Sequence, residues 1–349
     1  MSWNIALICG ARPNFMKIRP LQKELKKRSI KHFVVNTGQH FSSAMSLDLI
    51  KEFDLEINYH IEPNRDSVIN QFSDIMLGLE KIFVKENPNV VFVVGDINST
   101  LIAALVANKM NIKLVHIEAG LRSYNRLMPE EHNRVLTDHL ADFLLTTSEE
   151  AELNLNKEGL FDNIYFIGNL MIDTLVDFLP RIKDSDESFY FCTLHRAENV
   201  DSIDIFKEIL DSLEVISKDK KIYLPLHPRT EKMAKKFGLL TRMQNIFSLL
   251  PALDYKTSLF YQKNAKLVLT DSGGVQEESS YLGVPCLTLR NETERPITVE
   301  RGTNKIAGVS RKSILNAYHK IDWQKKNIII PLWDGKSAER AIDILVNNI

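Results

Sequence analysis

The sequence has only three cysteines, no excess of charge of either sign and no long apolar run. The 44 lysines and arginines balance the 45 aspartates and glutamates, so no global field attracts nucleic acid or an anionic membrane surface. Any anionic ligand must therefore be bound by local groups. The first apolar run reaches Arg12 too soon for a membrane span, and no basic segment precedes it. These absences predict a soluble, cytoplasmic protein without membrane or nucleic-acid partners.

The three cysteines are far apart in the sequence, which excludes a dense disulfide framework. Cys9, Cys192 and Cys286 each lie in an apolar run typical of a strand. Cysteine is often fully buried as a small apolar residue. We therefore expect three buried free thiols.

Several familiar ligand motifs are also missing. No Gly-Lys-Ser/Thr follows a glycine-rich turn, which excludes a Walker loop, and no G-x-G-x-x-G dinucleotide fingerprint is present. His116, His132 and His139 match neither HExxH nor a Cys/His ligand set. We therefore expect no metal site.

Short β-branched runs alternate with longer amphipathic runs in two series, separated by the polar stretch DSDES. Several short runs are apolar at consecutive positions, which is typical of parallel strands covered on both faces. We predict an α/β fold with two doubly wound Rossmann-like domains, residues 1–170 and 171–334, and a cleft between them. The last helix, about residues 335–349, could complete either domain. The predicted strands are residues 4–9, 32–37, 89–96, 113–119, 143–148, 163–169, 189–195, 221–227, 245–251, 266–272 and 285–290.

Charged and titratable residues stand at the carboxyl ends of the predicted strands or directly after them. Ligands of doubly wound sheets bind at the carboxyl ends of the strands, so these residues are the candidates for a functional site. They are Arg12, Lys17, Asp96, Glu118, His195, Arg196, His227 and residues 271–274.

The candidate carboxylates have structural alternatives that the sequence leaves open. Asp96 precedes Asn-Ser-Thr and could cap the next helix. Glu118 ends an apolar strand, where an unpaired carboxylate is costly, so a functional role is favoured. Glu130 and Glu131 follow Pro129 at the expected first turn of a helix, where acids suit the helix dipole.

The segment TDSGGVQEE predicts an anion-binding turn. Gly273 and Gly274 let backbone N–H groups approach a ligand and permit conformations that side chains forbid, and the next helix points its positive end at the same place. Glu278 could accept hydrogen bonds from a ribose, while Arg12 and Lys17 supply charge for a diphosphate. The residues thus favour a nucleoside diphosphate ligand. The alternative is that the glycines only pack a strand on a helix and that the acids are solvated.

Nine segments resemble, in order, the signature segments of the non-hydrolysing UDP-N-acetylglucosamine 2-epimerases. They are GARPNFMKIRPL, TGQHF, VVGDINST, HIEAGLRS, MPEEHNR, TLHRAEN, PLHPRT, TDSGGVQEE and TERPITVERGTN, spread over residues 10–304. The resemblance implies a fold of the glycosyltransferase B type, with the last helix packing back on the first domain. It further implies a homodimer, no cofactor and a role in polysaccharide biosynthesis.

The family interconverts UDP-N-acetylglucosamine and UDP-N-acetylmannosamine. The C2 hydrogen has no adjacent carbonyl and becomes acidic only as UDP departs and positive charge grows at C1. Elimination then gives 2-acetamidoglucal and UDP, and re-addition with protonation on the other face inverts C2. At least two acid/base groups should therefore flank the ring, and fixed donors should stabilise the leaving diphosphate.

The family's site residues transfer to this sequence by motif. Asp96, Glu118 and Glu130 correspond to the acid/base carboxylates, and His195 corresponds to a catalytic histidine near the diphosphate. The implied substrate-binding residues are Arg12, Lys17, Arg196, His227, Ser272, Gly273, Gly274 and Glu278.

Two departures from the family pattern stand out. Gln39 and His40 are followed by Phe41, Ser42 and Ser43, without the second polar side chain of allosterically activated members, so allosteric activation is not expected. The GARPNFMK form also differs from the GTRPE form, and relatives acting on other UDP-2-acetamido sugars, including diacetamido uronic acids, share much of the signature. The sugar therefore stays open.

Other classes of protein fit part of the pattern. A glycosyltransferase would use the same UDP site with one general base and an acceptor pocket. A UDP-sugar sensor would bind without turnover, and a hydrolysing epimerase would release free N-acetylmannosamine. Deuterium incorporation at C2 without an acceptor distinguishes an epimerase from the first two.

Overall fold

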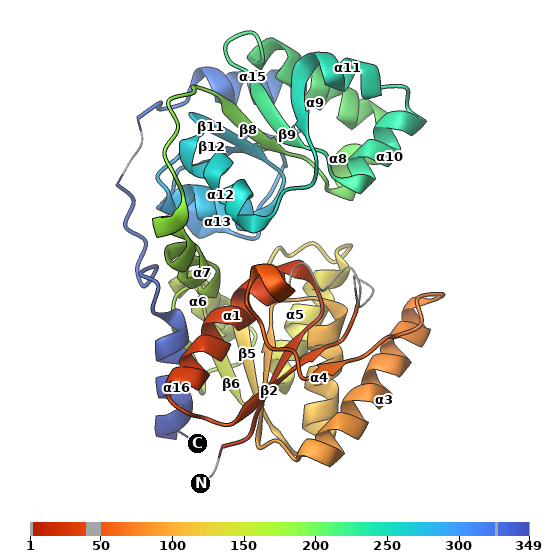
Figure 1. The fold of residues 1–349 in the computed structure, drawn as a ribbon, viewed down its shortest axis with the longest axis vertical. Helices are drawn as coiled ribbons and strands as arrows, with labels where there is room; N and C mark the ends of the chain where they lie inside the picture. The colour runs from red at the N-terminus through yellow and green to blue at the C-terminus, as the bar shows by residue number, and fades with distance from the viewer. Residues whose placement is uncertain (1–2, 40–49, 325–326, 349) are drawn as a thin grey trace. The chain divides into compact units, whose positions relative to one another are not determined.

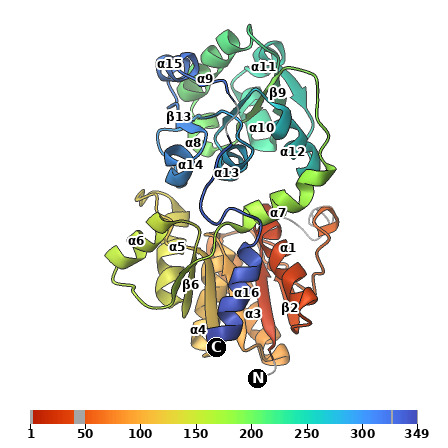
Figure 2. The same ribbon diagram turned by 90° about the vertical axis from the view of Figure 1, so that its left-hand side faces the viewer.

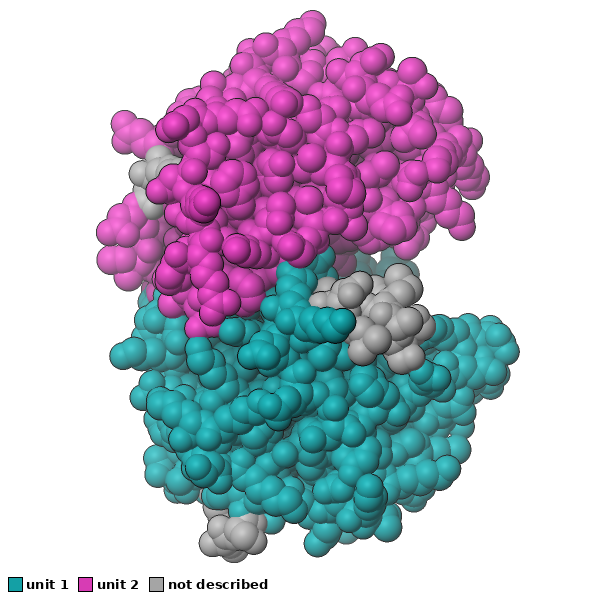
Figure 3. Space-filling model, in the orientation of Figure 1, with its two compact units in different colours: residues 1–174, 331–349 teal, residues 175–330 magenta. Residues whose placement is uncertain are grey.

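The structure is a computed structural model that describes residues 3–39, 50–324 and 327–348. The chain forms two compact units, each built on one parallel sheet with helices on its faces (Figures 1 and 2). Unit 1 comprises Met1–Thr174 and Pro331–Ile349, and unit 2 comprises Leu175–Ile330 (Figure 3). The prediction of two doubly wound Rossmann-like domains is confirmed.

Unit 1 contains a seven-stranded sheet in the order β3-β2-β1-β4-β5-β6-β7. Every pairing in it is parallel. All five residues of β1 and of β4 are buried, which explains why these strands are apolar at consecutive positions. The strands are β1 (Ile5–Cys9), β2 (His32–Asn36), β3 (Tyr59–His60), β4 (Val90–Val94), β5 (Lys113–Ala119), β6 (Phe143–Thr146) and β7 (Ile164–Phe166).

The helices of unit 1 include the last helix of the chain, α16, which lies beside α1 (Figures 1 and 2). The carboxylate of Asp173 accepts hydrogen bonds from the backbone N–H groups of Ser337 and Ala338, at 3.1 and 2.7 Å. It satisfies two donors in the first turn of α16. The helices are α1 (Arg12–Lys27), α3 (Val68–Glu86), α4 (Asn98–Lys109), α5 (Pro129–Leu140), α6 (Glu149–Lys157) and α16 (Ser337–Asn348), and α7 (Leu170–Phe178) continues from unit 1 into unit 2.

Unit 2 contains a six-stranded sheet in the order β10-β9-β8-β11-β12-β13, and every pairing is again parallel. Its strands are β8 (Tyr190–Thr193), β9 (Ile222–Pro225), β10 (Phe247–Leu250), β11 (Leu267–Thr270), β12 (Cys286–Thr288) and β13 (Asn304–Ile306). Its helices are α8 (Ala197–Val200), α9 (Ile203–Ile216), α10 (Pro228–Lys236), α11 (Leu240–Ile246), α12 (Tyr255–Asn264), α13 (Gly273–Tyr281), α14 (Pro296–Glu300) and α15 (Arg311–His319), after the short 3₁₀ helix Leu179–Arg181.

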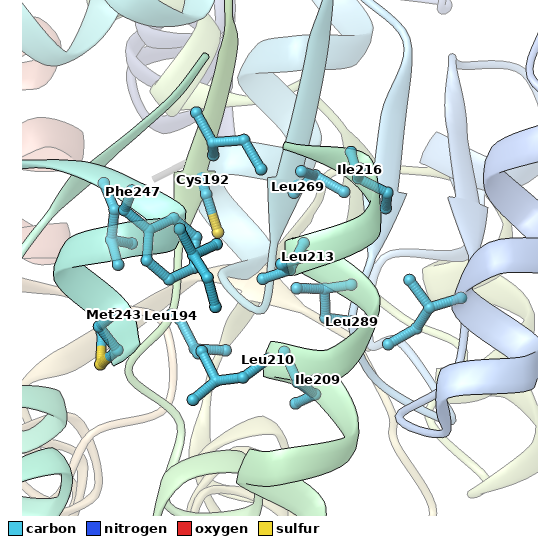
Figure 4. Packing of buried hydrophobic residues seen from close by; sticks show 14 of the residues in the cluster. Cys192, Leu194, Ile209, Leu210, Leu213, Ile216, Met243, Phe247, Leu269 and Leu289 are labelled. Carbon is cyan, nitrogen blue, oxygen red and sulfur yellow. The ribbon is translucent and has the colours of Figure 1, made fainter. Parts of the chain in front are cut away.

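The core of unit 2 shows how the sequence pattern becomes packing. Ile209, Leu213 and Ile216 lie on one face of α9 and belong to the same buried cluster as Cys192 of β8 and Leu269 of β11 (Figure 4). All five side chains are fully buried. The spacing of three to four residues places the apolar side chains on one stripe of the helix.

All eleven predicted strands are strands in the structure. The sequence prediction missed β3 and β13, which are two and three residues long and too short for a periodic signal. The three cysteines are buried and free, as predicted.

Candidate active site

In unit 1 the centre of the site is an ion pair between α1 and β5. Lys17 Nζ donates a hydrogen bond to Glu118 Oε2 over 2.6 Å, and both side chains are buried. Gly95, in the turn after β4, adopts φ +70°, and a Cβ built there would lie 3.4 Å from both charged atoms. Glycine at this position therefore leaves room for the pair. The sequence reasoning assigned Lys17 to the phosphate, whereas its ammonium here binds a candidate acid/base carboxylate.

Asp96 follows Gly95 and is held by an arginine that the sequence reasoning missed. A guanidinium N–H of Arg134, from α5, donates to the carboxylate of Asp96. Asn133 Nδ2 also donates to the backbone carbonyl of Asp96, over 2.9 Å. The residue that caps α4 is Ile97, so the alternative that Asp96 caps this helix is wrong. The Asp96 side chain keeps 28% of its surface exposed, which leaves it accessible to a ligand.

The two adjacent acids at the start of α5 have different environments. Glu131 is buried and accepts hydrogen bonds from the backbone N–H groups of Ser123 and Tyr124, at 2.9 and 2.8 Å. Burial alone would raise the pKa of Glu131, but these N–H groups and Arg134 lower it below its ordinary value. Glu131 thus fixes the preceding loop, while Glu130 is only half-buried on the first turn of the helix.

Arg12 is the first residue of α1 and is half-buried. The helix begins directly after β1, so the side chain starts at the carboxyl edge of the unit 1 sheet, where the candidate carboxylates also lie. The residues at positions 40–43, on which the expectation about allosteric activation depends, lie outside the described residues.

In unit 2 a carboxylate and a histidine form a pair between the ends of β8 and β11. Asp271 is fully buried, and its Oδ1 lies 3.0 Å from His195 Nδ1. Its Oδ2 accepts hydrogen bonds from the backbone N–H groups of His195 and Arg196, each over 2.8 Å. Burial alone would raise the pKa of Asp271, but the hydrogen bond and charge of His195 lower it below its ordinary value.

This pair fixes the orientation of the histidine ring. With Nδ1 bound to a carboxylate, Nε2 of His195 becomes the atom that can exchange a proton with a ligand. His195 stays partly exposed, with 34% of its side chain accessible. The ring of His227 is its neighbour, with ring centroids 5.3 Å apart. His227 caps α10, since its Nδ1 accepts a hydrogen bond from the Arg229 N–H, which is a structural role.

The predicted anion-binding turn is the N-terminus of α13. Ser272 is the capping residue, and Gly273 and Gly274 are the first two helical residues. Both glycines have helical backbone conformation, so the expectation that they need conformations forbidden to side chains is wrong. What glycine provides here is space, because a Cβ on Gly273 would lie 3.3 Å from Glu294 Oε1.

Behind the turn the two glutamates of α13 are buried, so the alternative that they are solvated is wrong. Glu278 Oε2 accepts a hydrogen bond from Gln262 Nε2 of α12 over 2.8 Å. Glu277 is bound by Arg295 over 2.9 Å. Each acid therefore has a buried polar partner inside unit 2.

Arg196 belongs to a buried charge cluster that the sequence reasoning missed. Arg196 and Arg290 both bind Glu294, at 3.2 and 2.7 Å. Burial alone would raise the pKa of Glu294, but the nearby arginines lower it to about 2. Because this carboxylate also lies against Gly273, the cluster orients Arg196 beside the helix N-terminus.

The residues that the sequence reasoning missed could be found only in part from the sequence. Arg134 lies four positions after Glu130, a spacing that places both on one helical face and offered a signal. Asp271 belongs to the quoted TDSGG segment, but no local pattern indicated that it binds His195. Glu294 lies far along the chain from Arg196, and only the fold brings them together.

No group of three or more side chains suited to hold a metal ion exists among residues 3–39, 50–324 and 327–348. His116, one of the histidines considered for a metal, has its ring nitrogens 2.6 Å from Asp138 and 2.9 Å from the Gly95 carbonyl. Within the same ranges no helix is long and apolar enough to cross a membrane.

Comparison with known proteins gives a consistent result. The sequence model of the family described as UDP-N-acetylglucosamine 2-epimerase matches residues 23–346. A UDP-N-acetylglucosamine 2-epimerase of Methanococcus maripaludis is 38% identical, over 98% of each chain. A UDP-2,3-diacetamido-2,3-dideoxy-D-glucuronate 2-epimerase of Pseudomonas aeruginosa is 35% identical, over 90% of each chain. The crystal structure of the Methanocaldococcus jannaschii UDP-GlcNAc 2-epimerase in complex with UDP-GlcNAc and UDP superposes with a TM-score of 0.88, at 36% identity, over 99% of this chain and 100% of that one.

Proposed function

Because the chain belongs to the UDP-N-acetylglucosamine 2-epimerase family, we propose that it interconverts UDP-N-acetylglucosamine and UDP-N-acetylmannosamine. The observation that carries the proposal is the pair of carboxylates at the ends of β4 and β5, each bound to one cation. Lys17 binds Glu118, and Arg134 binds Asp96. Two carboxylates near one sugar ring suit a reaction that removes a proton from one face of a carbon and returns one to the other face.

We propose elimination followed by re-addition as the chemical route. The C1–O bond breaks and its electron pair leaves with UDP, while a carboxylate takes the C2 proton and the C2–H electrons form the C1–C2 double bond. UDP then attacks C1 again, and a proton reaches C2 from the opposite face. Asp96, Glu118 and Glu130 serve as the acid/base groups in this proposal.

Unit 2 supplies the groups for the nucleotide in this proposal. The diphosphate binds at the N-terminus of α13, at Ser272, Gly273 and Gly274, because the N–H groups of a helix start favour anions. Glu278 accepts hydrogen bonds from the ribose. His195 donates a proton or hydrogen bond to the departing diphosphate through Nε2, since Asp271 holds its other nitrogen.

Several cationic groups complete the proposed phosphate contacts. Arg196 is oriented by Glu294, which leaves further guanidinium N–H groups for a phosphate oxygen. Arg12 binds the diphosphate from the start of α1. Lys17, whose ammonium binds Glu118, is a further proposed phosphate contact. His227 is a secondary contact beside His195.

The direct test is turnover in deuterium oxide without any sugar acceptor. We expect UDP-N-acetylglucosamine to acquire deuterium at C2 and UDP-N-acetylmannosamine to form, as followed by mass spectrometry and NMR. Replacing Asp96, Glu118 or Glu130 by the corresponding amide should lower kcat at least about 100-fold. The control is Asp142→Asn, because the Asp142 carboxylate lies at the opposite edge of the same sheet. This variant should have the kcat of the parent enzyme.

Other outcomes of this assay identify the alternatives. An absence of deuterium at C2 would contradict the proposal and favour a glycosyltransferase or a UDP-sugar sensor. Free N-acetylmannosamine accumulating together with UDP would indicate a hydrolysing epimerase.

A second candidate is epimerisation of a UDP-2-acetamido uronic acid, which the 35% identity to the diacetamidoglucuronate epimerase supports. Both reactions use the same carbon and the same leaving group. A screen of UDP-2-acetamido sugars, scored by deuterium at C2, identifies the substrate as the sugar with the highest kcat/KM.

We further propose that the enzyme is a cytoplasmic homodimer that serves polysaccharide biosynthesis. One face of α3 supports a dimer, since Ile69, Leu77 and Val84 are 75%, 51% and 69% exposed. Exposed apolar residues at this spacing form a helical stripe that a second copy can cover. Light scattering on the purified protein should give twice the 40.0 kDa mass of one chain.

A further inference from the structure

Glu118 has an unusual backbone conformation for a residue with a side chain. Its φ is +70°, in the left-handed region that favours glycine. The pairing of β5 with β6 shifts register between Ile117 and Ala119, so Glu118 is the extra residue of a β-bulge. A bulge redirects the side chain of its residue, and such strained positions persist only where the surroundings hold them.

One carboxylate from α5 binds the strand on both sides of this bulge. Asp138 is fully buried, and its Oδ1 accepts a hydrogen bond from His116 Nδ1 over 2.6 Å. Its Oδ2 accepts one from the backbone N–H of Gly120 over 3.1 Å. His116 stands two residues before Glu118 and Gly120 stands two residues after it, so Asp138 joins the two flanks of the strained residue.

The same contact extends to the turn that carries Asp96. His116 Nε2 donates to the Gly95 carbonyl over 2.9 Å, and Gly95 directly precedes Asp96. Both ring nitrogens of His116 thus lie within hydrogen-bond distance of an oxygen atom. Asp138 is therefore connected, through the imidazole of His116, to the strand that carries Glu118 and to the turn that carries Asp96.

Asp138 is ionised and its charge is balanced. Burial alone would raise its pKa, but His116 and Arg122 lower it below the ordinary value. Arg122 lies 2.7 Å from Asp138 Oδ2 and also binds Glu158 over 2.6 Å. The groups that face Asp138 are therefore donors, and its two oxygens are both engaged.

We propose that Asp138 is a positioning residue for the epimerisation: by joining His116 and Gly120 it holds Glu118 in the left-handed conformation that aims its carboxylate at Lys17. Asp138 itself acts through Glu118 and contacts no substrate. The inference rests on the proposed acid/base role of Glu118. The simpler alternative is that Asp138 only neutralises buried cations and stabilises unit 1.

The test is Asp138→Asn, which keeps the size of the side chain. An amide has no charge and only one acceptor oxygen, so the charge-assisted hydrogen bond on the other side is lost or replaced by a weaker neutral one. We expect kcat to fall at least about 10-fold, with KM for the UDP-sugar changed less than about twofold, because the nucleotide is bound by other groups. A crystal structure of the variant should show Glu118 displaced from Lys17.

The matched control is Asp142→Asn. Asp142 also binds the backbone of β5, at its other end, since Oδ2 accepts from the Leu114 N–H over 2.8 Å. It should leave kcat and KM within about twofold of the parent enzyme. If Asp138→Asn does not fold, His116→Gln is the second variant. It removes the hydrogen bond between residue 116 and Asp138, since the amide can still donate to the Gly95 carbonyl without reaching Asp138. Its kcat should fall in the same way.

These results distinguish a positioning role of Asp138 from a purely stabilising one. Parent-like kcat in Asp138→Asn, or an equal loss in Asp142→Asn, would overturn the positioning role. So would a variant crystal structure in which Glu118 keeps its positive φ and its contact with Lys17. An absence of deuterium incorporation by the parent enzyme would instead refute the proposed function, and the crystallographic comparison would still decide what Asp138 holds.

Discussion

The ion pair between Lys17 and Glu118 allows a quantitative prediction. Both side chains are at least 93% buried, the exposed fractions being 7% and 4%, and the charged atoms are 2.6 Å apart. Removing one partner of such a pair leaves a buried charge without its counter-ion and costs about 3 to 5 kcal/mol. We therefore expect Lys17→Met and Glu118→Gln each to lower the free energy of unfolding by about this amount.

The double variant should recover most of the lost stability. Methionine and glutamine carry no charge, so no uncompensated ion remains. We therefore expect the free energy of unfolding of the double variant to lie within about 1 kcal/mol of the parent value. Urea denaturation of the parent, both single variants and the double variant measures the coupling. All three variants should have kcat at least about 100-fold below the parent value, because a carboxylate or its cation is missing.

The control is an exposed pair in the same sheet. Lys113 and Asp142 are 2.9 Å apart, with 55% and 34% of their side chains exposed. Lys113→Met should cost less than about 1 kcal/mol and keep kcat, since solvent screens exposed charges. The reasoning fails if Lys17→Met costs no more than Lys113→Met, or if the two single losses at Lys17 and Glu118 simply add in the double variant.

Three further predictions concern unit 2 and the thiols. Asp271→Asn should lower kcat about 10- to 100-fold, because the His195 ring loses the carboxylate that orients it; an unchanged kcat would contradict the pairing. The folded pKa of Glu294, about 2, lies below its ordinary value of about 4.5, so its contribution to stability is complete above pH 4.5 and declines as pH falls toward 2. Urea titrations should lose this pH dependence in Glu294→Gln. Burial raises the pKa of all three thiols, that of Cys286 to about 12, so a thiol reagent at pH 8 should react only after unfolding; rapid labelling of the native protein would refute this.

The strands show what the local sequence can predict and what it cannot. Eleven strands were recognisable because parallel strands covered on both faces are apolar over consecutive residues, as in β4. The strands β3 and β13 are formed by pairing with a neighbour, not by their own composition, so the sequence carried no signal for them. Local sequence left the place of α16 open for the same reason, because its contact with Asp173 joins positions 164 and 165 residues apart. Only the family resemblance predicted that this helix packs on the first domain.

The site shows a similar limit at the level of single side chains. Asp96, Glu118 and His195 could be singled out because each lies at the carboxyl end of a strand or just after it, where a doubly wound sheet binds its ligands. The contacts around them could not be assigned: Asp138, Asp271 and Glu294 carry no local motif for the contacts they make, and the spacing of Arg134 from Glu130 did not indicate that Arg134 binds Asp96. The role of Gly273 was also misjudged, since its backbone is helical and only the position of Glu294 explains the need for glycine.

The sequence by itself determined the fold class, the two series of strands, the buried thiols and the family, because burial periodicity and short motifs depend on neighbouring residues along the chain. Only the tertiary structure decided which charges meet: Lys17 with Glu118, Arg134 with Asp96 and Asp271 with His195. The physical reason is that a buried charge is stable only beside a counter-charge, and that partner comes from another element brought near by the packing of the sheet.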